Sequence, residues 1–189
     1  PVDGADDGAS GVGVLLEIAR QLGQKAPQVG VDILFCDAED YGTPEFVDSY
    51  KPDTWCLGTQ FWVKNPHVKG YKAEFGILLD MVGGRNATFF REFQSQRAAA
   101  PILEMVWSKA RDLGYGKYFI NAEGGAITDD HQYVISGLRI PSIDIINYDP
   151  DSKTGFAPYW HTQKDNMDNI DRETLKAVGE TVLAVIYNQ

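Results

Sequence analysis

The sequence predicts an α/β fold: a mixed, mostly parallel, twisted sheet flanked by helices, arranged in three layers. Two observations predict it. Short apolar runs typical of strands that are covered on both faces occur at 31–38, 74–83 and 141–148. Segments with helical spacing of apolar residues occur at 10–24, 100–114 and 171–189. Strands alternating with helices favour a parallel sheet, and residues 1–189 suit a single domain.

The boundaries of the predicted helices follow from local signals. Asp7 and Ser10 are good N-cap residue types ahead of the first helix, and Asp171 caps the last one. Gly114 ends the middle helix. On the first helix we expect the buried face to contain Val12, Leu15, Leu16, Ala19 and Leu22. Residues 42–72 contain Gly, Pro and many aromatics without a clear period, which predicts a long and functional loop.

Composition excludes several classes of protein. The formal net charge of −10 disfavours a nucleic-acid partner. The sequence contains no run of about 18 apolar residues, so we expect no membrane span. The two cysteines, Cys36 and Cys56, do not form a disulfide scaffold. The chain begins "PVDGADDG" without a start methionine, so we expect an N-terminal segment to precede it.

Acidic residues follow two of the predicted strands. "DAEDYG" places Asp37, Glu39 and Asp40 after the first apolar run, and Asp80 ends the second. The carboxyl ends of parallel strands are where sites form in such sheets. Burying unpaired carboxylates costs on the order of several kcal/mol each unless a positive group meets them. Either these acids extend into water or a cation lies among them.

A metal site is one interpretation of these acids and the histidines. "GADDGASG", "DAEDYG", "LLDMVG", "ITDDHQY" and "YWHTQKDN" together supply carboxylates and an imidazole. Catalytic zinc uses three such protein ligands and an open fourth position. Most of these motifs also have a structural interpretation: Asp7 as a helix cap, Glu39 and Asp40 as a solvated strand end, His161 as a structural histidine, and Asp165 with Asp168 as a solvated turn or as caps before the last helix. The residues alone leave both interpretations open.

The order of these motifs resembles that of the zinc-dependent aminopeptidases and of their offshoot, the glutaminyl-peptide cyclotransferases. The resemblance extends from Gly4 to the last helix. "LLDMVGGRNATF", "GGAITDDHQYVISGLRIPSIDII" and "FAPYWHTQKDNMDNID" are more similar to the cyclases, in a bacterial-type variant with Asp40 where Glu is common. The resemblance implies a zinc-exopeptidase fold and a single zinc-exopeptidase-like catalytic domain over residues 1–189.

The resemblance also implies roles for individual residues. Asp7, Asp40 and His161 would be the zinc ligands. Glu39 would be the general acid/base, within a carboxylate network completed by Asp80 and Asp129. The substrate pocket would be lined by Trp160, Phe156 and Ile127, with Trp55 or Trp62 as a further wall. One zinc ion is expected, and a second is possible if an upstream histidine exists.

The activity implied by the resemblance is cyclisation of an N-terminal glutamine to pyroglutamate with release of ammonia. The alternatives are a zinc aminopeptidase, in which Glu39 activates water, and a non-catalytic binding domain that retains the fold. The implied partners are peptides or proteins with a free N-terminus. We also expect a monomer and, by family analogy, a periplasmic or secreted location.

Overall fold

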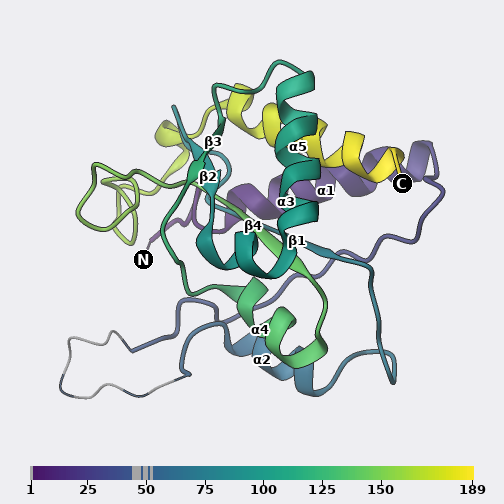
Figure 1. The fold of residues 1–189 in the computed structure, drawn as a ribbon. Coiled ribbons are helices and arrows are strands. Elements are labelled where there is room, and N and C mark those ends of the chain that lie inside the picture. The colour runs from purple at the N-terminus through teal and green to yellow at the C-terminus, as the bar shows by residue number, and fades with distance from the viewer. Residues whose placement is uncertain (1, 44–47, 49–50, 52) are drawn as a thin grey trace.

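The computed structural model describes residues 2–43, 48, 51 and 53–189, so part of the predicted loop 42–72 lies outside the described residues. Its helices and strands follow one another as shown in Figure 1. In order they are α1 (Ala9–Gln24), α2 (Leu57–Lys64), β1 (Gly76–Asp80), β2 (Phe89–Arg91), α3 (Phe93–Asp112), β3 (Phe119–Glu123), α4 (Asp130–Leu138), β4 (Ser142–Ile146) and α5 (Arg172–Tyr187).

Two pairs of parallel strands lie at the centre. β1 pairs with β4, with Leu78 opposite Asp144, and every residue of β4 is buried. β2 pairs with β3, and an isolated bridge between Phe89 and Asn147 connects this pair to the end of β4. The predicted strands at 74–83 and 141–148 are therefore confirmed, and both are parallel as expected.

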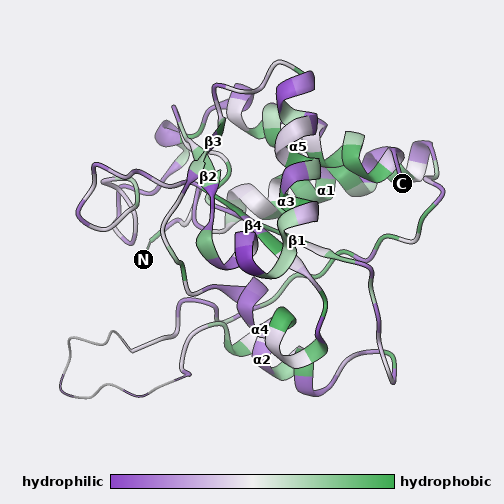
Figure 2. Ribbon diagram, viewed as in Figure 1, coloured by the Kyte–Doolittle hydropathy of each residue, from purple (hydrophilic) through white to green (hydrophobic). Residues whose placement is uncertain are grey.

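Helices cover both sides of β1 and β4 (Figure 1). α1, α3 and α5 pack together on one side, and α4 lies on the other side with α2 against it. Figure 2 shows that hydrophobic residues make up much of α5 and alternate with polar residues in the central strands. The core between these layers includes Ile143, Ile145, Leu103, Trp107 and Val178. The α/β class with parallel strands and three layers is thus confirmed.

The predicted strand at 31–38 is wrong for the described structure. The segment has no regular secondary structure, and Leu34 and Phe35 are 38% and 55% exposed. A strand needs a neighbour for its backbone N–H and C=O groups, and none of the described strands lies beside this segment. Instead the segment borders a cavity of about 1360 Å³, the apolar cavity, whose lining also includes residues 75–79.

The buried face of α1 also differs from the prediction. Val14 and Ile18 are buried, whereas Val12 and Leu16 are 41% and 57% exposed. Apolar residues cover more than half of the circumference of this helix, and the buried residues Val14 and Ile18 lie toward one edge of that broad face, so spacing alone could not select them. Val12 and Leu15 border the apolar cavity. The N-cap residue is Gly8, and neither predicted cap residue caps the helix with its side chain.

The other helices show where local signals were informative. α5 begins after Asp171, whose side chain accepts from the Glu173 N–H, as predicted. α3 begins seven residues before the predicted start, because Glu92 caps it and the chain continues through a non-helical residue, Ala99, into the turn that contains Pro101. Four short elements, α2, α4, β2 and β3, were not predicted. None of the described helices has both the length and the apolar character needed to cross a membrane.

Candidate active site

Asp7 lies in a turn that is fixed by a second, buried aspartate. The backbone N–H groups of Asp6 and Asp7 donate to the two carboxylate oxygens of Asp165, at 2.8 and 3.1 Å. Asp165 is fully buried, so the interpretation of this residue as part of a solvated turn is wrong. The Asp6 carboxylate in turn accepts from the Gly83 N–H at 2.8 Å and from the Tyr159 hydroxyl at 2.8 Å. These bonds hold the Asp7 side chain at the start of α1.

This clamp gives a testable expectation. Asp165→Ala leaves two N–H donors without their acceptor, and an unsatisfied buried donor costs about 1–3 kcal/mol. We expect the free energy of unfolding in urea to fall by about that amount, together with weaker zinc binding at Asp7. Asp168→Ala is the matched control, because Asp168 is exposed on the neighbouring turn. Equal stability of the two variants would contradict the clamp.

Glu39 and Asp40 are held in place by the start of α2. The N–H groups of Cys56, Leu57 and Gly58 donate to the carbonyls of Glu39, Ala38 and Asp37, at 2.9, 3.1 and 3.0 Å. The buried thiol of Cys56 also donates to Glu39 Oε1, with 3.4 Å between sulfur and oxygen. The start of α2, a helix that the sequence did not predict, therefore holds Glu39 and Asp40 in place. We had expected the strand predicted at 31–38 to do so.

His161 projects from an irregular turn toward both aspartates. Its backbone has a φ of 55°, in the left-handed region that a non-glycine residue adopts only when its surroundings enforce it. The Trp160 ring stacks on the imidazole with 3.8 Å between the ring centroids. Phe156 packs against Trp160 at 4.7 Å. This aromatic stack fixes the direction of the imidazole.

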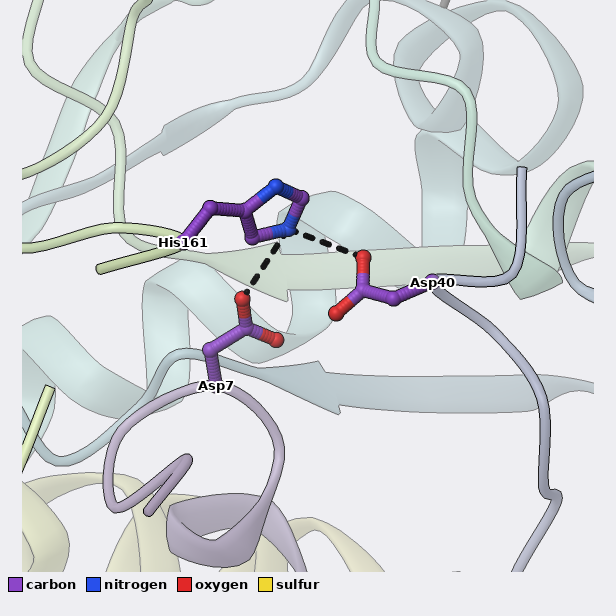
Figure 3. A group of neighbouring side chains, drawn as sticks. All are labelled: Asp7, Asp40 and His161. Carbon is purple, nitrogen blue, oxygen red and sulfur yellow. Dashed lines mark hydrogen bonds and ion pairs between the residues drawn. The ribbon is translucent and has the colours of Figure 1, made fainter. Parts of the chain in front are cut away.

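The three predicted zinc ligands converge (Figure 3). His161 Nε2 lies 2.9 Å from Asp40 Oδ1 and 3.4 Å from Asp7 Oδ2. One ligand atom from each residue falls within 4.8 Å of the others. Two carboxylates and one imidazole are a donor set that suits zinc and leaves a fourth position for a substrate. Asp7, Asp40 and His161, which lie far apart in the sequence, therefore fit a zinc ion.

The electrostatics of the site point the same way. Burial, followed by the nearby Asp40 carboxylate, raises the pKa of Asp7 to about 6. Burial and Asp40 together raise the pKa of Glu39 to about 8. The carboxyl groups of Asp80 and Asp129 have pKa values well above the usual range, chiefly because they are buried and close to other carboxylates. A bound cation would relieve this repulsion.

A dependence of stability on pH follows for the metal-free protein. In the unfolded chain Asp7 and Glu39 lose their protons near 3.8 and 4.5, but in the folded protein they keep them up to about 6 and 8. The folded state therefore binds more protons in this window, and its stability falls as pH rises. We expect the melting temperature of the metal-free protein to fall as the pH rises from about 4.5 to 8. Over the same range, the increase in melting temperature on adding zinc should become larger, because zinc binds deprotonated ligands. A melting temperature of the metal-free protein that rises across this pH range would contradict the raised pKa values of Asp7 and Glu39.

A second cavity, of about 800 Å³, opens beside the three ligands. We call it the aromatic cavity because Trp55, Trp160 and Phe156 line it, together with Ile127, Glu39, Asp80 and Asp129. Trp55 packs directly over Gly42, where an added Cβ would lie 1.9 Å from the indole ring. Trp62 lies elsewhere: it borders the apolar cavity and donates to His67. Of the two tryptophans expected as a further wall, the structure places Trp55 in the aromatic cavity.

A family model described as peptidase family M28 matches residues 1–186. The chain belongs to peptidase family M28. A solved Zn-dependent exopeptidase from Parabacteroides distasonis is 82% identical with a TM-score of 0.98, and the match covers 100% of this chain and 65% of that one. A glutaminyl cyclase from Tannerella forsythia is 75% identical with a TM-score of 0.96, over 100% and 65% of the two chains. The glutaminyl-peptide cyclotransferase of Bos taurus is 28% identical over 203 residues, 91% of this chain and 52% of that protein.

The chain therefore spans about half the length of the Bos taurus protein. The family predicted from the order of the motifs is confirmed. Within this M28 chain, sequence reasoning missed the residues that support the site, above all Asp6, Asp165 and Cys56. Asp6 and Asp165 both stand inside the quoted motifs, but their polar neighbours gave no sign that the two carboxylates are buried. For Cys56 there was no signal either, since a lone cysteine in an aperiodic loop has no distinctive pattern.

Proposed function

We propose that the protein is a zinc-dependent glutaminyl-peptide cyclotransferase, which converts the N-terminal glutamine of a peptide to pyroglutamate and releases ammonia. The observation that carries the proposal is the convergence of Asp7, Asp40 and His161 beside a cavity with aromatic walls, with the Glu39 carboxyl at its edge. The solved glutaminyl cyclase of Tannerella forsythia supports it through its 75% identity. The substrates would be peptides or proteins with a free N-terminus.

Asp7, Asp40 and His161 would hold the zinc, which when bound supplies a Lewis acid for the side-chain amide carbonyl of the glutamine. The α-amine of the same residue attacks that carbon, so a C–N bond forms within the substrate and a five-membered lactam results. The bond between that carbon and the amide nitrogen breaks, and the nitrogen leaves as ammonia. Because the substrate brings its own nucleophile, the reaction consumes no water.

Glu39 would carry the proton in this reaction. As a carboxylate it accepts one proton from the attacking amine, and as the acid it returns that proton to the departing nitrogen. Burial and Asp40 raise its pKa to about 8, which makes both forms accessible near neutral pH. Asp80 and Asp129 surround it with further carboxyl groups that favour a shared proton.

The walls of the aromatic cavity would bind the glutaminyl residue and exclude water. Trp160 and Phe156 form one wall, Trp55 another and Ile127 a third. Exclusion of water matters because hydrolysis of the same amide would give glutamate. We further propose one zinc ion per chain, a monomeric protein and, by family analogy, a periplasmic or secreted location.

A matched pair of peptides tests the intramolecular step. We expect a Gln-initiated peptide to lose one ammonia, whereas an Asn-initiated peptide of otherwise equal sequence stays unchanged, because its attack would close a four-membered ring. Mass spectrometry of the zinc-loaded protein with each peptide gives the answer. Conversion of the glutamine to glutamate would contradict the proposal, since water would then be the nucleophile.

A further inference from the structure

A buried carboxylate that the proposed reaction does not use lies beneath one wall of the aromatic cavity. Glu92 is 1% exposed and caps the start of α3. Its carboxylate accepts hydrogen bonds from the backbone N–H groups of Gln94, Ser95 and Ile127 and from the Ser95 hydroxyl, at 2.6–3.1 Å. The buried imidazole of His131 approaches the same carboxylate at 3.3 Å. These contacts join α3, α4 and the segment that precedes α4.

The charge of Glu92 gives these contacts strength. Burial alone would raise its pKa, but the contacts with His131 and with the N–H groups of Gln94 and Ser95 outweigh burial and hold the pKa at about 2. Glu92 is therefore a carboxylate at neutral pH. Hydrogen bonds to an ionised acceptor are roughly twice as strong as those between neutral groups.

The segment that Glu92 holds is residues 124–128, the wall segment, which runs from β3 to Asp129, the N-cap of α4. Gly125, Ala126, Ile127 and Thr128 all border the aromatic cavity. Asp129 is held separately, because its side chain accepts from the Asp130 N–H. Its first part is fixed by backbone bonds: the Gly124 N–H donates to the Arg91 carbonyl at 2.8 Å, and the Phe93 N–H donates to the Gly125 carbonyl at 3.1 Å.

The middle of the wall segment is held by side chains. The Ile127 N–H donates to Glu92 Oε1 at 3.1 Å, and the Gln132 side-chain amide donates to the Ile127 carbonyl. Among the described contacts of Ile127, these two fix its backbone. The position of this wall therefore depends on Glu92 from one side and on Gln132 from the other.

We propose that Glu92 is a positioning residue for substrate binding, which fixes the Ile127 wall of the aromatic cavity. The substrate invoked here rests on the cyclase function proposed above. A displaced wall would weaken contacts that the substrate makes equally before and during the reaction. Losing such uniform binding raises KM and leaves kcat largely unchanged.

The test substitution is Glu92→Gln, which keeps the shape of the side chain. Its amide has one acceptor oxygen in place of two. Three of the five donors converge on Oε2, from Ser95 N–H, the Ser95 hydroxyl and His131, so we expect the amide oxygen to stay there. The new NH₂ group then faces the N–H groups of Gln94 and Ile127, donor against donor. The matched control is Asp171→Asn, the same change at the N-cap of α5, whose carboxylate accepts from the Glu173 N–H outside both cavities.

Two readouts separate positioning from general stability. For Glu92→Gln we expect KM for a Gln-initiated peptide to rise about tenfold with kcat within about threefold of the original, and faster amide exchange in the wall segment. Asp171→Asn is expected to change neither the kinetics nor that exchange. A kcat loss with unchanged KM, or an equal KM increase in the control, would overturn the proposal.

Gln132→Ala provides a second test if Glu92→Gln folds poorly, and amide exchange is its deciding readout because Gln132 itself borders the aromatic cavity. It removes the other bond to Ile127, so we expect faster exchange in the wall segment and a higher KM. Faster exchange with unchanged KM would overturn the proposal, because the wall would then move without affecting binding. Amide exchange is measured without substrate, so it tests the anchoring of the wall segment separately from the cyclase function. Absence of cyclase activity in the original protein would refute the proposed function. Unchanged amide exchange in Glu92→Gln would refute the anchoring of the wall segment by Glu92.

Discussion

Glu39→Gln should abolish turnover of a Gln-initiated peptide while the protein still binds zinc. The amide cannot accept the proton of the attacking amine, and loss of a general acid/base typically lowers kcat by about 10²- to 10⁴-fold. Asp7, Asp40 and His161 are unchanged, so zinc measured by elemental analysis should stay at the original level. The Cys56 thiol can still donate to the amide oxygen, which keeps the side chain in place.

The matched control for this substitution is Glu173→Gln, on the exposed first turn of α5. It makes the same change from carboxyl to amide but lies outside both cavities, and we expect unchanged kcat. A Glu39→Gln protein with near-original kcat would remove Glu39 from the proton-transfer role. Loss of zinc in the same variant would show instead that Glu39 helps to bind the metal.

His161→Ala should lose both zinc and activity. His161 is the one imidazole in the candidate site, and it faces Asp40 at 2.9 Å and Asp7 at 3.4 Å. Loss of a residue that only supports a zinc ligand weakens affinity by about 10- to 100-fold, so loss of a ligand should weaken it by more than about 100-fold. Competition with a chelator of known affinity measures the change.

His67→Ala is the control for the histidine. His67 contacts Trp62 and Tyr71, away from the three ligands. We expect its zinc affinity and kcat/KM to equal those of the original protein. If His161→Ala bound zinc as tightly as His67→Ala, the candidate metal site would be refuted.

The central strands and the last helix could be predicted because their signals are local. β1 and β4 are apolar runs of the length of one strand, and Asp171 is a helix cap directly before an amphipathic pattern. The six proposed zinc and catalytic residues could be named because each stands in a short acidic or histidine motif. The structure brings them to the same place from segments that are up to 154 positions apart, as for Asp7 and His161.

The missed features depend on contacts between distant residues. The segment 31–38 has the composition of a strand, but pairing rather than composition makes a strand, and none of the described strands lies beside it. The burial of Asp165 beneath Asp7 is a contact across 158 positions, so its polar neighbours suggested a solvated turn instead. Glu92 lies ahead of the predicted start of its helix, on the far side of the non-helical residue Ala99.

The most direct measurement of the central claim uses two peptides with the zinc-loaded, full-length protein, one beginning with glutamine and one with leucine, followed by mass spectrometry. The proposed cyclase predicts loss of one ammonia from the first peptide and no shortening of either. Release of a free N-terminal amino acid from either peptide would contradict it and make the protein an aminopeptidase.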